Sequence, residues 1–100
     1  QFLPWLNVSL TGIVGVSWLD RRDDPSNVRY RSFAAASRNG TAWSINRRVG
    51  TALSNPFNDG FSGAFIGDYT GNTWTSNSVN IAWTDTRVGS ARAFTGGFAF

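Results

Sequence analysis

Short runs in which apolar and polar residues alternate fill most of this chain, and turn-forming residues separate them. Alternation with a period of two is typical of β-strands. The alternating runs predict strands over residues 3–9, 13–19, 28–36, 42–49, 65–72, 79–84 and 91–100. Clusters of Gly, Asn, Asp, Ser and Pro fall between these runs and suit tight turns. The pattern therefore predicts an all-β chain.

One strand pattern occurs twice. Residues 14–22 read VGVSWLDRR and residues 79–87 read VNIAWTDTR, so both contain an apolar-x-apolar-x-Trp-x-Asp-x-Arg frame. The shared residues are two positions apart, and in an extended strand they all point to one face. A strand that recurs in this way predicts that the chain is built from repeated β-units.

The predicted strands divide into two units. Residues 1–50 form a unit of four strands, residues 51–64 a connecting loop, and residues 65–100 a second unit that lacks its outermost strand. Units of about 40–50 residues with four strands are typical of β-propeller blades. We therefore expect about two four-stranded antiparallel blades, the second incomplete. Two blades do not close a ring, so we expect a six-bladed ring, formed by oligomerisation or by a longer parent chain.

The composition agrees with this fold and excludes several kinds of site. The sequence has no Lys, Glu, His, Cys or Met, and Gln only at position 1, so good helix formers are scarce. The absence of Cys and His removes disulfides, thiolate metal sites and a histidine base. The net charge of +3 comes from Arg residues spread along the chain, which disfavours a nucleic-acid partner. No apolar run approaches the roughly 20 residues of a membrane helix.

Freedom from thiols, with abundant Ser, Thr, Asn and Gly, predicts a secreted protein. The motifs that begin at Asn7 and Asn39 fit the N-glycosylation pattern, although such matches arise by chance in a chain of this composition. Neither observation says which partner the chain binds.

Three stretches together resemble the sialidase-like propellers with bacterial neuraminidase (Asp-box) repeats. They are the paired W-x-D-x-R strands, G-D-Y-T-G at residues 67–71, and S-R-N-G-T-A-W at residues 37–43. The usual Asp-box reads S/T-x-D-x-G-x-T-W. Gly40 and Trp43 fit it, but Ala36 replaces the Ser or Thr, Arg38 the Asp and Ala42 the Thr. The resemblance implies stacked blades and a glycan as partner.

The repeated strands supply the candidate ligand-binding residues. These are Trp18, Asp20, Arg22, Trp83, Asp85 and Arg87. In a sugar subsite, Trp stacks on the ring while Asp and Arg bind hydroxyl or carboxylate groups. In the structural alternative, each Asp accepts backbone N–H bonds at the strand end and pairs with Arg. Recurrence in both units favours the structural alternative, because a single active site does not need two copies.

Asp68 and Tyr69 are the candidate catalytic residues. The resemblance implies that the G-D-Y-T-G stretch borders the central channel, with Asp68 as acid or base and Tyr69 as nucleophile or sugar contact. Such enzymes pair the Tyr with a Glu and carry an F/Y-R-I-P motif, and this sequence has neither. It therefore holds no complete sialidase site, and whether it belongs to an enzyme stays open. The cluster Asp20, Asp23 and Asp24 suits a solvated turn better than a Ca²⁺ site, so we expect no cofactor or metal.

The sequence thus predicts a carbohydrate-recognition or scaffold segment of a sialidase-like β-propeller. Its partners are a glycan and either further copies of itself or the rest of a longer chain. One alternative is a fragment of a glycoside hydrolase whose remaining catalytic residues lie elsewhere. A second is a purely structural segment without a ligand.

Overall fold

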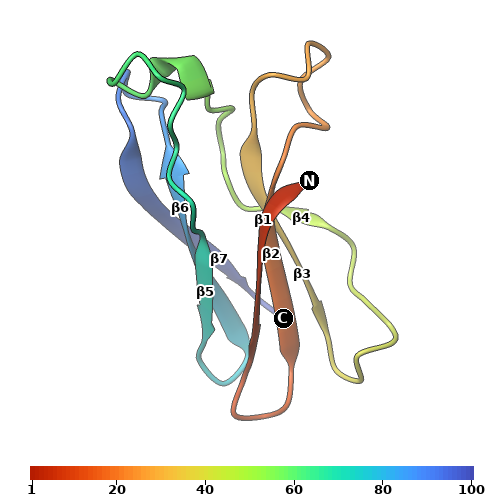
Figure 1. Ribbon diagram of the computed structural model, residues 1–100. Coiled ribbons are helices and arrows are strands. Elements are labelled where there is room, and N and C mark those ends of the chain that lie inside the picture. The colour runs from red at the N-terminus through yellow and green to blue at the C-terminus, as the bar shows by residue number, and fades with distance from the viewer.

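The chain folds into two antiparallel β-sheets, which confirms the all-β prediction. A computed structural model describes residues 1–100 (Figure 1). The elements are β1 (Phe2–Val8), β2 (Val14–Asp20), β3 (Arg31–Ser37), β4 (Arg47–Arg48), a short 3₁₀ turn η1 (Pro56–Asn58), β5 (Gly71–Trp74), β6 (Ser78–Asp85) and β7 (Arg92–Ala99). Neighbouring strands follow one another along the sequence, in the orders β1-β2-β3-β4 and β5-β6-β7. No helix is long and apolar enough to cross a membrane.

The two sheets use the same registers around their central strands. In the first sheet, Trp18 of β2 lies opposite Phe33 of β3. In the second, Trp83 of β6 lies opposite Phe94 of β7. The two sheets are therefore built alike, and β2 and β6 occupy equivalent places.

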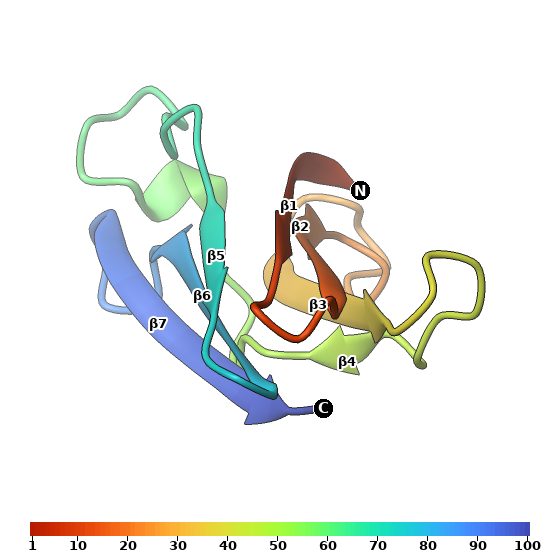
Figure 2. The ribbon, with the colours of Figure 1, turned by 90° about the horizontal axis from the view of Figure 1, so that it is seen from below.

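Each sheet has a face that we call its front, defined by the apolar and Trp side chains of the repeated frame. The front of the first sheet carries Val14, Val16 and Trp18, and the front of the second carries Val79, Ile81 and Trp83. The opposite face of each sheet is its back. The core forms where the back of the first sheet meets the front of the second, and it contains Leu19, Tyr30, Ala34, Val79, Ile81 and Trp83. Figure 2 shows the sheets side by side, with β5 alongside β1.

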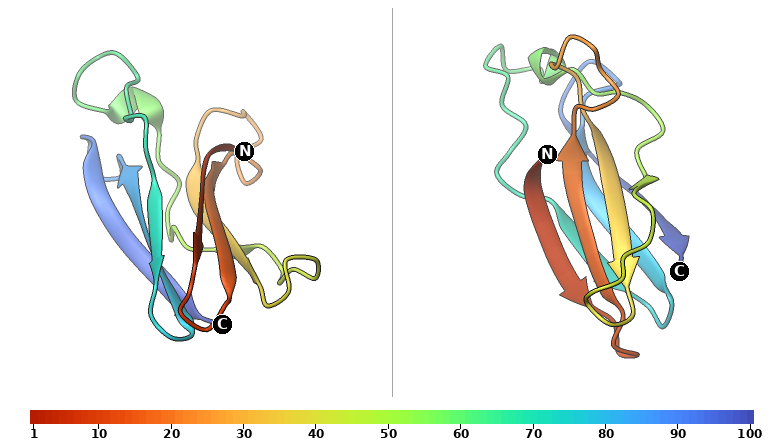
Figure 3. Two further views of the ribbon diagram at one scale, coloured as in Figure 1. Left: turned by 60° about the horizontal axis from the view of Figure 1, so that its bottom comes forward. Right: turned by 90° about the vertical axis from the view of Figure 1, so that its right-hand side faces the viewer.

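The first sheet lies over the second (Figure 3, right). Gly15 of β2 permits this approach, because a Cβ added there would lie 2.3 Å from the Trp74 ring. The Asn72 amide donates to the Ser17 hydroxyl at 3.0 Å and to the Trp5 carbonyl at 2.9 Å. The interface thus combines apolar packing with two polar contacts of Asn72, one of them buried.

Two predicted strands are much shorter than the alternation indicates. The run 65–72 becomes strand only from Gly71, because the Asp59 carboxylate binds the Phe65 N–H at 2.7 Å and Gly67 adopts a positive φ of 82°. The run 42–49 pairs with β3 only at Arg47–Arg48 and through a bridge from Trp43 to Ser37. Side-chain hydrogen bonds hold both segments as loops.

Candidate functional site

The repeated strand forms the same local structure twice. We call the Trp18, Asp20 and Arg22 group the first clasp, and the Trp83, Asp85 and Arg87 group the second clasp. Each clasp lies at the end of a central strand, where alternation brings Trp and Asp to one face and the chain then turns. In both, the carboxylate holds the indole, the guanidinium and a backbone N–H together.

In the first clasp, the Trp18 indole N–H donates to Asp20 Oδ2 at 2.8 Å. The Arg22 backbone N–H donates to Asp20 Oδ1 at 2.8 Å, and its guanidinium donates to Oδ2 through Nε and a terminal nitrogen. The guanidinium also lies 4.8 Å from the centre of the Phe33 ring, which stacks on Trp18. Asp20 therefore accepts four hydrogen bonds within its own sheet.

The second clasp repeats this arrangement. The Trp83 indole donates to Asp85 Oδ2 at 3.1 Å, and the Arg87 backbone N–H donates to Oδ1 at 2.9 Å. The Arg87 side chain binds both carboxylate oxygens, at 2.9 Å and 2.6 Å, and lies 4.5 Å from the centre of the Phe94 ring. A further guanidinium nitrogen donates to the Thr51 hydroxyl at 2.9 Å. Each side-chain nitrogen of this clasp therefore has a partner in the chain.

These contacts keep both carboxyl groups ionised. Burial by itself raises the pKa of Asp85, but hydrogen bonds from Arg87 and Trp83 outweigh it and lower the pKa to about 2. The pKa of Asp20 is lowered further, since bonds from Arg22 and Trp18 again outweigh burial. The paired carboxylates in turn raise the pKa of Arg22 and Arg87. A carboxyl group held in this state does not serve as a general acid near neutral pH.

The two rings that complete the clasps were missed by the sequence reasoning. Phe33 and Phe94 each follow an Arg by two positions, as Arg31-x-Phe33 and Arg92-x-Phe94. Their registers set each Phe opposite a clasp Trp and each of these Arg residues opposite a clasp Asp. A search for a second repeat would have found this pair. A search at one fixed distance from the first repeat misses this pair, because the β2–β3 turn is longer than the β6–β7 turn.

The predicted catalytic pair lies apart from both clasps. Asp68 and Tyr69 belong to the loop before β5, and both side chains are exposed, that of Tyr69 by 79%. No hydrogen bond or ion pair joins either side chain to the rest of the chain. Their catalytic role stays a prediction.

The carboxylates near the first turn take separate partners. Asp20 belongs to the first clasp, and Asp23 binds Arg48 at 2.7 Å. Asp24 accepts the backbone N–H groups of Arg29 and Val28, which lower its pKa to about 2 although burial opposes them. No three such side chains gather in a group that could hold a metal ion.

The 37–43 loop forms a turn that is held by side-chain hydrogen bonds. The Asn39 side-chain oxygen accepts the backbone N–H groups of Thr41 and Ala42, at 3.0 Å and 2.8 Å. The Ser37 hydroxyl accepts the Gly40 N–H at 2.9 Å. Asn39 therefore binds the turn with its side-chain oxygen, as an Asp in this loop would.

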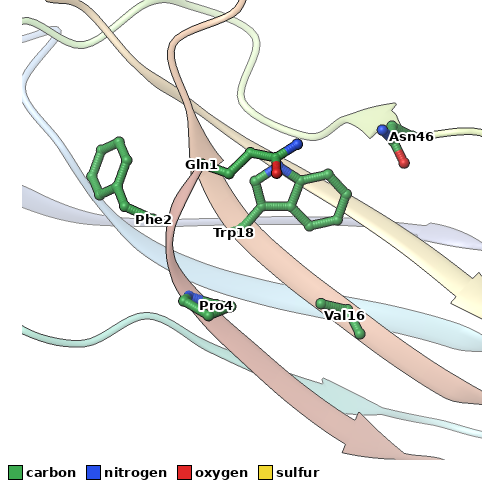
Figure 4. A pocket seen from close by; sticks show the side chains of 6 residues that line it. All are labelled: Gln1, Phe2, Pro4, Val16, Trp18 and Asn46. Atoms are coloured by element: carbon green, nitrogen blue, oxygen red, sulfur yellow. The ribbon is translucent and has the colours of Figure 1, made fainter.

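A shallow pocket of about 340 Å³ lies on the front of the first sheet. Figure 4 shows the side chains that line it, which are Gln1, Phe2, Pro4, Val16, Trp18 and Asn46. Two amides and a half-buried indole together are suited to a polar ring compound.

Comparisons of the chain with protein-family models, with curated proteins and with solved structures found no match. The function is therefore inferred from the geometry of the clasps and of the two sheets.

Proposed function

We propose that this chain is a scaffold segment of a sialidase-like β-propeller, formed by two adjacent blades of which the second lacks its outer strand. The observation that carries the proposal is the stacking of two equivalent sheets, back to front, with a clasp at the same place in each. Blades of a propeller repeat one sheet in this radial manner. The first sheet corresponds to one blade, and the second sheet to the next.

In this function the clasps stabilise the ends of the central strands. Their Trp, Asp and Arg groups bind one another, so a ligand would have to break several of these bonds to use them. The carboxylates are almost fully buried, with 4% of the Asp20 side chain and 1% of the Asp85 side chain exposed. Their removal should therefore lower stability rather than glycan affinity.

The test compares Asp20→Asn and Asp85→Asn with the wild-type chain in chemical unfolding and on a glycan array. Asn keeps the shape of the side chain but loses the charge that binds the guanidinium. We expect a lower free energy of unfolding for both variants and no change in glycan binding. Unchanged stability with loss of a glycan signal would contradict the scaffold function.

Carbohydrate recognition is the second candidate, and the pocket beside Trp18 favours it. A partly exposed indole with the Gln1 and Asn46 amides around it could stack on a sugar ring and bind its hydroxyls. The matched variants are Trp18→Phe and Trp83→Phe, since Trp83 is only 5% exposed. A glycan bound at this pocket should be lost in Trp18→Phe and kept in Trp83→Phe. Equal binding by both variants would exclude the pocket as its site.

A further inference from the structure

The front faces of the two sheets are alike in sequence but differ in how they are covered. In the second sheet, Val79 and Ile81 are each only 2% exposed, because the first sheet packs on them. In the first sheet, the equivalent Val14 and Val16 are half-buried. The neighbouring strand β1 adds Leu6, which is 59% exposed, and Val8, which is 50% exposed, to this face. The front of the first sheet is therefore uncovered, although it carries the same apolar pattern as the covered front of the second sheet.

The back of the second sheet is the other uncovered surface. Its central strand presents Asn80 and Ala82, both exposed, and β7 adds Thr95 and Gly97 beside them. On the back of the first sheet, the residues equivalent to Asn80 and Ala82 are Gly15 and Ser17. Apart from Asn80, the side chains at these places are small or absent, and on the first sheet Gly15 lets the Trp74 ring of the facing front approach.

Two contacts of the internal interface, carried over by register, indicate which residues would meet if the two free surfaces came together. Asn72 donates to Ser17 inside the chain. On the free front of the first sheet, Leu6 occupies the position equivalent to Asn72. On the free back of the second sheet, Ala82 occupies the position equivalent to Ser17, so both members of this polar pair are replaced by apolar residues.

The second contact sets the Trp74 ring against Gly15. By register, Val8 takes the place of Trp74 and Asn80 that of Gly15. The free front thus has Val8 where the covered front has a Trp, and the free back has Asn80 where the covered back has a Gly. Apolar character and volume are thus balanced across the two free surfaces, although they lie on different sheets.

We infer that the front of the first sheet binds the back of the second sheet of another copy of this chain. The inference rests on the proposed function, because it takes the internal blade interface as its template. The contact joins two different surfaces, so it is heterologous and leaves one free surface of each kind on a pair of copies. Repetition of the contact gives a ring or a filament.

The experiment measures the mass of the folded chain by size-exclusion chromatography with light scattering at micromolar concentration. We expect the wild type to elute as a multiple of the 10.9 kDa chain. Val16→Asp on the front and Ala82→Asp on the back should each give the single-chain mass. Leu10→Asp is the control, since Leu10 is fully exposed in the β1–β2 turn, and it should leave the mass of the assembly unchanged.

The decisive arm mixes the two single-chain variants. Val16→Asp keeps an intact back and Ala82→Asp an intact front, so the mixture should form one interface and reach twice the mass of a single chain. A folded wild type at the single-chain mass would overturn the inference, as would variants that still assemble or a mixture that stays at the single-chain mass. If Val16→Asp does not give a native circular dichroism spectrum, Leu6→Asp on the edge strand replaces it.

The failure of this inference is distinguishable from failure of the scaffold function. Asp20→Asn and Asp85→Asn are measured in the Val16→Asp background, where assembly is blocked. A loss of stability there supports the clasps as structural elements whatever the mass of the wild type. Unchanged stability there would count against the scaffold function alone.

Discussion

The two clasps make nearly the same hydrogen bonds in different surroundings. The second clasp lies on a face that the first sheet covers, and Trp83 is only 5% exposed. The first clasp lies on a face that nothing covers, and Trp18 is half-buried. The bonds within a clasp are thus set by its own nine residues and the neighbouring strand. The burial of its indole is set by the sheet that lies on top.

The largest expected difference between the clasps is at tryptophan. Trp83→Ala should lower the free energy of unfolding by about 3–5 kcal/mol, because it leaves a cavity between the sheets. Trp18→Ala should cost about 1–2 kcal/mol in the single-chain state, because part of the side chain is already in water. Urea unfolding of both variants in the Val16→Asp background measures the difference. Equal losses would contradict the link between the burial of each indole and its contribution to stability.

The next effect is the loss of carboxylate charge. Asp85→Asn should cost about 3 kcal/mol, since it removes a nearly buried carboxylate charge and leaves the Arg87 guanidinium, whose side chain is 25% exposed, without its charged partner. Asp20→Asn should cost less, because the Arg22 side chain is 37% exposed and water replaces part of the lost bonding. Guanidinium chloride unfolding at pH 7 gives both values. The reverse order would contradict the link between burial and clasp strength.

Gly15 tests how closely the sheets approach. Gly15→Ala should cost about 1–3 kcal/mol, because its Cβ would overlap the Trp74 ring. Gly71→Ala is the matched control in β5, where an added Cβ meets nothing within 4 Å, and it should change stability by less than about 0.5 kcal/mol. Thermal unfolding compares the two variants. A tolerated Gly15→Ala would mean that the sheets separate easily.

Acid should weaken the second clasp within a defined range. The pKa of Asp85 is about 2 in the folded chain and near 3.8 ordinarily, so its contribution is fully present above about pH 4. It is lost progressively as the pH falls through 2, and below that value the carboxylate is protonated in both states. Unfolding free energies from pH 5 to pH 2 should fall less steeply for Asp85→Asn than for the wild type. Parallel pH profiles would show that Asp85 does not carry this dependence.

The smallest effect on stability is expected at the loop outside both sheets. Asp68→Ala and Tyr69→Phe should change the free energy of unfolding by less than about 0.5 kcal/mol, because both side chains are exposed. The same variants test the hydrolase alternative with a fluorogenic sialoside. Loss of turnover at unchanged stability would support catalysis by this pair. If neither the chain nor a longer parent turns the substrate over, the hydrolase alternative fails.

The sequence predicted the strands around both clasps because alternation and turn residues are local signals. It could not predict which faces are covered, because β2 has apolar residues of both parities, Leu19 on one face and Val16 on the other. Only the position of the second sheet decides between them. The strand expected over 65–72 was wrong before Gly71, because the buried Asp59 carboxylate binds that segment from outside the window in which alternation is measured.

The candidate site was predicted in its residues but not in its contacts. The two Trp, Asp and Arg sets share a strand face, as the spacing indicated. The Phe33 and Phe94 rings come from the next strand, and sequence distance alone does not reveal that pairing. The propeller itself, the glycan and secretion remain predictions.

The two free surfaces of the chain differ, so an assembly built through the inferred contact has a direction. A sheet stacked on the second sheet would meet the exposed side chains of Asn80 and Ala82. A sheet stacked on the first sheet would meet Val16 and Trp18, which are half-buried. Every copy added to such an assembly therefore points the same way as the copy before it.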